Sequence, residues 1–151
     1  MPALVIIDMQ TGFNTPKKAL PEVLKRIAEF KNANRPIVLV EYRHFGHTID
    51  EVMQAIGDYP TIKVEKSNDD GGDEVSKVLK KYHRRLKALT LCGVNTCYCV
   101  GETALNLTSN GYKVKIRGTA CHNWCDKANC VENLRKNIKK REETYGHNRV
   151  C

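Results

Sequence analysis

Two short runs of apolar residues constrain the fold more than any other feature of this chain. Ala3–Ile7 and Ile37–Val40 contain no polar residue and are rich in β-branched side chains. Such continuous runs are typical of strands that are buried on both faces of a parallel sheet. A carboxylate follows each run directly, Asp8 in the first case and Glu41 in the second. We therefore expect a sheet with polar side chains at its strand ends.

Strand and helix patterns alternate along the whole chain. Further strands are predicted at 62–65, 88–92, 112–116 and 149–151, and helices at 20–32, 49–56, 74–82 with Asp73 as N-cap, from Cys99 onward, and at 130–142. This alternation favours an α/β fold with right-handed crossovers. We predict that residues 1–151 form a single domain, a three-layer Rossmann-like fold whose mostly parallel central sheet is flanked by helices.

The segment LTLCGVNTCYCVGETALN, residues 89–106, reads as a strand, a tight turn at Gly93 and a helix. In open α/β sheets such turns lie at the edge where ligands bind, and the start of a helix presents N–H groups and a positive dipole end. Cys99 falls there, so we expect its thiolate to form more easily than that of a free cysteine. It is a candidate nucleophile, and a buried structural cysteine is the competing interpretation.

Length and charge exclude several classes of protein. A chain of 151 residues fits one ordinary domain. No apolar run of about eighteen residues and no basic-then-apolar leader is present, so we expect a cytoplasmic protein without a membrane partner. The 25 Lys and Arg residues outnumber the 17 Asp and Glu residues. Because they are spread over several predicted helices with few aromatic residues between them, solvated helix faces are favoured over nucleic-acid binding, and an anionic substrate is a second alternative.

The chain has seven cysteines, an odd number that argues against a disulfide framework. We expect most of them to be thiols. One cluster has the pattern C-x3-C-x4-C with an adjacent histidine (Cys121, His122, Cys125 and Cys130). This spacing does not match the paired ligands of zinc sites, so we expect no metal there. Cys97 is a candidate to resolve an oxidised Cys99, although cysteines this close in sequence rarely reach disulfide geometry.

Three reactive side chains follow predicted strands. Because the carboxyl ends of parallel strands converge on one edge of the sheet, Asp8, Lys66 and Cys99 are expected to meet there. Asp8 can accept the thiol proton, Lys66 can stabilise the thiolate and a developing oxyanion, and Cys99 can attack an electrophilic carbon. Taken singly, Asp8 is equally well read as a turn residue and Lys66 as a solvated lysine.

Three segments of the chain resemble the isochorismatase-like cysteine hydrolases, a family that includes nicotinamidases, N-carbamoyl amidohydrolases and isochorismatases. They are ALVIIDMQTGF at 3–13, VEKSNDD at 64–70 and LCGVNTCYCVGETALNLTSNGYKV at 91–114. The resemblance implies that Cys99, rather than Cys97, is the nucleophile, that Asp8 is the general base and that Lys66 is its partner. It also implies a small-molecule substrate and a homo-oligomer.

The resemblance further implies an unusual turn for binding the oxyanion. In the family pattern a cis peptide bond, here between Val94 and Asn95, aims backbone N–H groups at the oxyanion beside Cys99. A non-proline cis bond costs about 3 to 4 kcal/mol, so it would mark strain at a functional turn.

The chain departs from the nicotinamidase pattern where a metal would bind. Nicotinamidases have an Asp-Trp-His loop with a second histidine, whereas this chain reads YRHFGH at 42–47. The two remaining histidines, His44 and His47, are a poor metal site, so we favour solvated or substrate-contacting roles for them. Gln10 and Phe13 are further candidates for the substrate pocket. We expect no cofactor.

These observations predict a cysteine hydrolase. It would cleave a small amide, carbamoyl or related C–N substrate through a covalent acyl-cysteine intermediate at Cys99. Cleavage of a vinyl ether, as in isochorismatases, is an enzyme alternative that the resemblance leaves open, although Cys99 favours acyl chemistry. An alternative of another class is a catalytically silent binding or assembly protein with the same fold. An unreactive Cys99 would distinguish the silent protein from the cysteine hydrolase.

Overall fold

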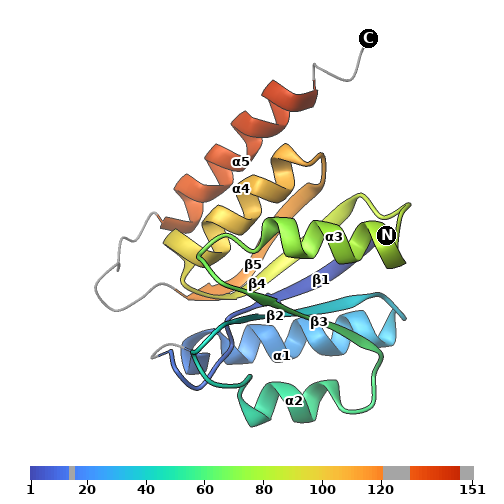
Figure 1. Ribbon diagram of the computed structural model, residues 1–151, viewed down its shortest axis with the longest axis vertical. Coiled ribbons are helices and arrows are strands. Elements are labelled where there is room, and N and C mark those ends of the chain that lie inside the picture. Colours follow the sequence, from blue (N-terminus) through green and yellow to red (C-terminus); the bar gives the residue numbers. More distant parts are fainter. Residues whose placement is uncertain (14–15, 121–129, 147–151) are drawn as a thin grey trace.

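In the computed structural model, which describes residues 1–13, 16–120 and 130–146, five parallel strands form one sheet between two layers of helices (Figure 1). The strands are β1 (Pro2–Ile7), β2 (Ile37–Tyr42), β3 (Thr61–Lys66), β4 (Ala88–Val94) and β5 (Lys113–Ala120). The helices are α1 (Pro16–Asn32), α2 (Asp50–Ile56), α3 (Gly72–Tyr82), α4 (Gly101–Ser109) and α5 (Cys130–Gly146), and a π-helical turn (Thr96–Val100) precedes α4. The predicted three-layer α/β architecture is confirmed.

Strand β1 supplies side chains to both hydrophobic layers. Ala3, Val5 and Ile7 pack with residues of α3, α4 and α5. Leu4 and Ile6 point to the opposite face and pack with residues of α1 and α2. All five side chains are fully buried, and burying a side chain of the size of valine, leucine or isoleucine contributes roughly 1.5 to 3 kcal/mol. The continuous apolar sequence is therefore required by burial on both faces.

The strand order is β3-β2-β1-β4-β5, so the direction in which successive strands are added to the sheet reverses between β1 and β4. The chain first builds outward from β1 to β3 and then returns to β4 beside β1. Because crossovers are right-handed, this reversal puts α1 and α2 on one face and the later helices on the other (Figure 1). The loops after β1 and β4 consequently diverge and leave a crevice at the carboxyl ends of these strands. In open α/β sheets ligands bind in a crevice of this kind.

Several element boundaries differ from those predicted. Helix α1 begins at Pro16 instead of residue 20, and strand β5 continues to Ala120 instead of ending at residue 116. Helix α3 begins at Gly72, where the Asp70 side chain accepts a hydrogen bond from the Gly72 N–H at 2.7 Å. Asp73 therefore lies within the first turn and is not the N-cap. The predicted strand at 149–151 lies outside the described residues.

Cys97 and Cys130 form a disulfide that ties the π-helical turn to the start of α5. This pair is an exception to the expectation that most of the cysteines are thiols, and it engages the Cys97 sulfur that was a candidate to resolve an oxidised Cys99. The two residues are 33 positions apart in sequence, and they meet because α5 packs beside α4 and the turn. Among the described residues, Cys92 and Cys99 are free and buried. Cys121 and Cys125, the other members of the predicted cluster, lie outside the described residues.

None of the helices in the described part of the chain has the length and apolar character needed to span a bilayer.

Gly93, near the end of β4, is required by its backbone and by its neighbour. Its φ is 126°, and a Cβ atom there would collide with the backbone of Ile7 on β1. We expect Gly93→Ala to lower the free energy of unfolding by about 3 kcal/mol or more, from strain and overpacking together.

Gly57→Ala is the matched control for this substitution. Gly57 also has a positive φ, 56°, but a Cβ atom there would meet only the Gln54 carbonyl oxygen, at 3.7 Å. Gly57→Ala should lower the free energy of unfolding by only about 1 to 2 kcal/mol, from the strained backbone conformation alone. Urea unfolding followed by circular dichroism measures both, and equal losses would contradict the proposed contact with Ile7.

Candidate active site

Asp8 lies immediately after β1, at the switch point of the sheet. It is fully buried, and its φ of 56° places it in the left-handed region, which is uncommon for a residue with a side chain. Its N–H donates to the Val40 carbonyl at 3.0 Å, and its own carbonyl accepts from the Gln10 N–H at 2.7 Å. These bonds hold the backbone in a conformation that costs energy, as is common at functional sites.

Lys66, the last residue of β3, brings a buried ammonium to Asp8. Its Nζ lies 3.3 Å from Asp8 Oδ2, and both side chains are fully buried. The same Nζ donates to the carbonyl oxygens of Asn68 at 3.2 Å and Asp69 at 3.0 Å. It also lies 4.2 Å from the centre of the Tyr42 ring. Because an unpaired buried charge is very costly, these contacts explain how a lysine is tolerated inside the protein.

The register of the sheet explains why Tyr42 lies under the lysine. Tyr42 pairs with Lys66 across β2 and β3, and β2 separates β3 from β1. The lysine side chain must therefore cross one strand to reach Asp8, and it does so over the face of the Tyr42 ring.

Cys99 lies in the π-helical turn that follows β4. The turn begins at Asn95, whose left-handed conformation (φ 63°, ψ 54°) redirects the chain. The Asn95 carbonyl accepts hydrogen bonds from the N–H groups of Tyr98 at 3.0 Å and Val100 at 3.1 Å. Such wide turns are frequent at functional sites. The Cys99 side chain is only 3% exposed.

The predicted cis peptide bond between Val94 and Asn95 is absent, and no cis peptide bond occurs within residues 1–13, 16–120 or 130–146. The left-handed conformation of Asn95 makes the turn instead, and Asn tolerates this region better than most residues. Val94 is fully buried in the hydrophobic layer beneath α1 and α2.

The Asn95 side chain connects the carboxylate and the thiol. Its Nδ2 lies 3.5 Å from Asp8 Oδ2 and 3.8 Å from Cys99 Sγ. Asn95 is 5% exposed, so its amide is held inside the protein. The structure therefore brings together all three side chains of the predicted Asp8, Lys66 and Cys99 site, with an amide between two of them.

Burial dominates the electrostatics of this site. It raises the pKa of Asp8 above its ordinary value, and the neighbouring Lys66 ammonium offsets only part of that rise. Burial also raises the pKa of the Cys99 thiol, and the Asp8 carboxylate raises it further. The expected stabilisation of the thiolate by the helix start is therefore outweighed. Cys99 rests as a thiol next to a carboxylate that can accept its proton.

A cavity of about 290 Å³ leads to the Cys99 sulfur. It is lined by Phe13, Tyr42, Phe45, Asp69, Asn95, Tyr98 and Cys99. Phe13 and Phe45 are stacked, with ring centres 4.6 Å apart and planes 3° from parallel. The Tyr42 ring is tilted against Phe45 at 4.8 Å. The lining of the cavity is thus mostly aromatic, and it includes Cys99.

The four weaker pocket predictions have different outcomes in the structure. Phe13 lines the cavity. Gln10 does not; it is fully buried and holds the loop after β2 by donating to the carbonyls of Tyr42 at 2.9 Å and Gly46 at 2.8 Å. His44 and His47 are exposed on that loop and do not line the cavity. Among the described residues no group of three or more potential ligands is close enough to hold a metal ion.

Sequence reasoning missed Asp69. Its Oδ1 lies 3.7 Å from Cys99 Sγ, and Asp69 lines the same cavity as the cysteine. The indication in the sequence was its position in VEKSNDD, three residues after Lys66.

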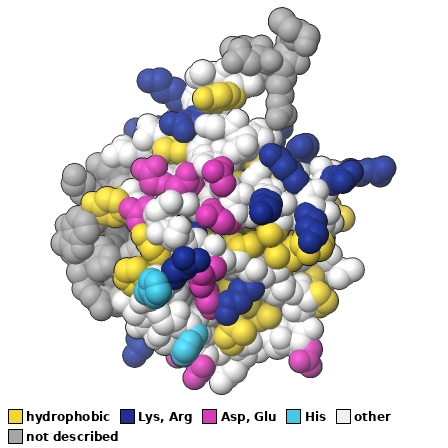
Figure 2. Space-filling view, viewed as in Figure 1, with side chains coloured by type: hydrophobic (Ala, Val, Ile, Leu, Met, Phe, Trp, Pro, Cys, Tyr) yellow, Lys and Arg dark blue, Asp and Glu magenta, His cyan; other side chains and the backbone are white. Residues whose placement is uncertain are grey.

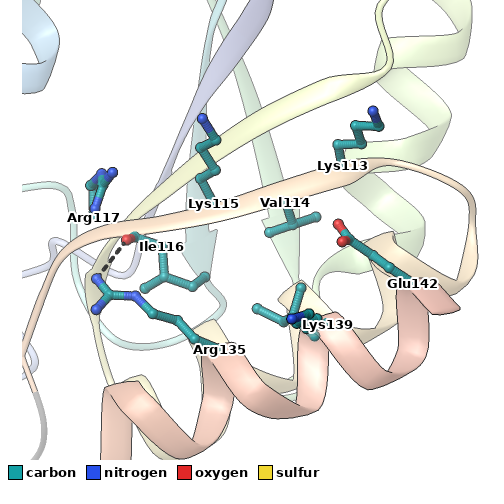
Figure 3. Close-up of a pocket in the computed structure, with 9 residues that line it drawn as sticks. Lys113, Val114, Lys115, Ile116, Arg117, Arg135, Lys139 and Glu142 are labelled. Carbon is teal, nitrogen blue, oxygen red and sulfur yellow. Dashed lines mark hydrogen bonds between the residues drawn. The ribbon is translucent and has the colours of Figure 1, made fainter.

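A larger cavity, of about 600 Å³, lies between β5 and α5 (Figure 3). Most of its lining side chains are cationic, and Arg135 donates to the Ile116 carbonyl at 3.1 Å. In Figure 3 the side chains of Lys113, Lys115 and Arg117 point away from α5, so they do not converge on the cavity. Its lining residues include no cysteine, serine or threonine. Basic side chains also lie on several separate parts of the surface in Figure 2, as expected of solvated faces.

Comparison with known proteins agrees with this architecture. The family model described as "Isochorismatase domain" matches residues 2–124. The chain is 29% identical over 121 residues to the secreted isochorismatase effector Isc1 of Phytophthora sojae, covering 75% of this chain and 58% of that protein. The chain spans little more than half the length of the curated relatives that it matches.

Solved structures share the fold at lower sequence identity. The N-carbamoylsarcosine amidase of Thermoplasma acidophilum has a TM-score of 0.79 at 20% identity, with 91% of this chain and 92% of that chain covered. The nicotinamidase SaPncA of Staphylococcus aureus has a TM-score of 0.75 at 21% identity, with 92% and 93% covered. Since the family model covers most of the sequence and the sheet, the chain belongs to the isochorismatase family.

Proposed function

We propose that this protein is a cysteine hydrolase that cleaves a small amide, carbamoyl or related C–N substrate through an acyl-cysteine intermediate. The observation that carries the proposal is the buried contact of 3.3 Å between Lys66 Nζ and Asp8 Oδ2, next to the Cys99 thiol. A buried ion pair is weak support for stability by itself, because desolvating the charges is so costly. Its position beside a thiol at the switch point favours a role in chemistry.

In the proposed reaction Asp8 moves one proton back and forth. As Cys99 Sγ attacks the carbonyl carbon, the thiol proton passes to Asp8. Asp8 then returns that proton to the leaving nitrogen as the C–N bond breaks, which leaves a thioester on Cys99. Water attacks the thioester and gives its proton to Asp8, the C–S bond breaks, and the sulfur regains a proton. The scheme uses no redox cofactor and no metal.

The raised thiol pKa fits this scheme. A nucleophile that rests as a thiol needs a base within reach, and Asp8 is that base. Lys66 keeps one positive charge beside whichever group is negative at each step. We assign the binding of the oxyanion to N–H groups at the start of the turn, including that of Cys99, and to the side-chain amide of Asn95.

The cavity supports a small substrate. Its volume of about 290 Å³ lies at the lower end of the range typical of ligand pockets. The two structural neighbours described above are both named as amidases, which is in keeping with cleavage of a C–N bond. A homo-oligomer and a cytoplasmic location stay predictions, and the secreted relative in Phytophthora sojae makes the second worth testing directly.

We expect Cys99→Ser and Asp8→Asn each to lower kcat/KM at least about a thousandfold, since each removes a group that forms or breaks bonds. Release of ammonia or amine from a panel of small amides and carbamoyl compounds measures activity. Intact-protein mass spectrometry should detect an acyl adduct on the native chain and none on Cys99→Ser. Asp73→Asn, which neutralises an exposed carboxylate on α3, is the control. A native chain with neither turnover nor adduct would favour the silent binding protein.

The pH dependence of kcat/KM tests the role of Lys66. Asp8 must be ionised to accept a proton, and its pKa is raised, so activity should fall with decreasing pH at a value above the ordinary carboxyl pKa of 3.8. Lys66→Met removes the charge that lowers the Asp8 pKa. The acid limb of the pH profile, where activity falls as the pH decreases, should therefore move to higher pH by at least about one unit.

Lys63→Met is the matched control for the pH experiment. Lys63 lies on the same strand, its side chain is 57% exposed, and it pairs with Glu41 at 3.0 Å. Its substitution should leave the acid limb where it is in the native protein. A limb that does not move in Lys66→Met would contradict the proposed coupling between Lys66 and Asp8.

A further inference from the structure

The proposed mechanism leaves one charged group of the site without a role. The Asp69 carboxylate lines the cavity, and its Oδ1 lies 3.7 Å from Cys99 Sγ. Asp69 is exposed, whereas Asp8, which also interacts with the thiol, is fully buried and does not line the cavity. Any substrate that reaches the sulfur through the cavity must therefore pass close to Asp69.

The loop that carries Asp69 is held at several points. Lys66 Nζ binds the Asn68 and Asp69 carbonyls, so the buried lysine fixes the backbone on which the carboxylate stands. Farther along, Thr103 Oγ1 accepts a hydrogen bond from the Gly71 N–H at 2.9 Å. A Cβ atom on Gly71 would lie 2.9 Å from Lys66 Cδ, so the loop also packs closely against the lysine side chain.

A second anchor belongs to the Asp70 side chain. It accepts hydrogen bonds from the Gly72 N–H at 2.7 Å and from Asn106 Nδ2 at 2.7 Å. Asp70 therefore faces α3 and α4, whereas Asp69, its neighbour, faces the cavity. The two adjacent carboxylates have different surroundings, and only one of them can act on a ligand at Cys99.

Asp69 sets the net charge of the cavity. The Lys66 ammonium and the ionised Asp8 carboxylate balance each other at 3.3 Å. Of the residues that line the cavity, Asp69 is the one with a carboxylate, and the others are aromatic apart from Asn95 and Cys99. The Tyr42 hydroxyl interacts with the Asp69 carboxylate. A negative charge beside aromatic rings is the environment that favours an organic cation.

We propose that Asp69 selects substrates by charge, favouring small amides that carry a protonated amino group near the scissile carbonyl and disfavouring those that carry a carboxylate. The preference among substrates rests on the proposed hydrolase function. The effect of the Asp69 charge in the cavity applies to any reagent that must reach Cys99, whether or not the protein is a hydrolase. The substrate preference and the charge effect can therefore be tested separately.

The first test uses charged thiol reagents and requires no turnover. The cationic trimethylammonium-ethyl and the anionic sulfonato-ethyl methanethiosulfonates react with a thiolate in the same way: a new S–S bond forms and methanesulfinate leaves. Rates at Cys99 are measured at one pH by peptide mass mapping, with Cys99→Ser as the blank. The ratio of the two rates cancels the thiolate fraction. The change of this ratio between two variants also cancels the intrinsic reactivities of the reagents, so it reports on the field that the substituted charge contributes.

The native chain should favour the cationic reagent, and Asp69→Asn should lower the rate ratio by about tenfold, because one charge acts with opposite sign on the two reagents. Asp73→Asn removes the same charge from an exposed residue of α3 that does not line the cavity, and it should leave the ratio within about twofold. A ratio that is the same in Asp69→Asn and the native chain would overturn the proposal.

The second test compares glycinamide, propionamide and malonamate as cationic, neutral and anionic amides of similar size. The native enzyme should have its highest kcat/KM for the cation, and Asp69→Asn should lower the ratio of kcat/KM for glycinamide to kcat/KM for malonamate by about tenfold. If no amide is hydrolysed but the reagent ratio still depends on Asp69, the hydrolase proposal fails and the charge selection stands. If amides are hydrolysed with no dependence on Asp69, the charge selection alone fails.

Discussion

The rest of the site depends on a buried ion pair between Lys66 and Asp8. Removing two charges from water costs several kcal/mol per ion, and mutual attraction repays this only when further polar contacts are made. Here the ammonium also has two loop carbonyls and the Tyr42 ring. Gly71 leaves room for the lysine side chain. The pair thus fixes the end of β3, the loop after it and the first residue after β1 in one arrangement.

The same pair determines how the thiol behaves. An ionised Asp8 beside Cys99 raises the thiol pKa, so a thiolate at rest is unfavourable, and the carboxylate is then available as a proton acceptor. In the proposed mechanism, Lys66 compensates the charge that moves between the two groups. Cys99 would then be activated only when a substrate is attacked, and it would remain a less reactive thiol between turnovers.

The sequence allowed the fold and the convergence of Asp8, Lys66 and Cys99 to be predicted, because both follow from the apolar runs and the parallel arrangement of the strands. Asp8 and Lys66 stand at strand ends, and such ends must converge. The predictions that failed concern properties that depend on the three-dimensional surroundings of a residue. The Cys99 pKa is set by burial, the turn at Asn95 by its left-handed backbone, and the Cys97 disulfide by the packing of α5. The sequence alone could not distinguish Asp69 from its neighbour Asp70, which has the same carboxylate and only a structural role in the loop.

The most direct test of the account is the pH dependence of iodoacetamide alkylation at Cys99 in the native chain and in Asp8→Asn, followed by peptide mass mapping. If burial and Asp8 keep the sulfur protonated, the native midpoint should lie above the ordinary thiol pKa of 9.0. It should fall in Asp8→Asn, because the variant removes a negative charge and leaves Lys66 unbalanced. A native midpoint below 9.0, or one that Asp8→Asn does not lower, would contradict the claim that Asp8 holds Cys99 as a thiol and accepts its proton.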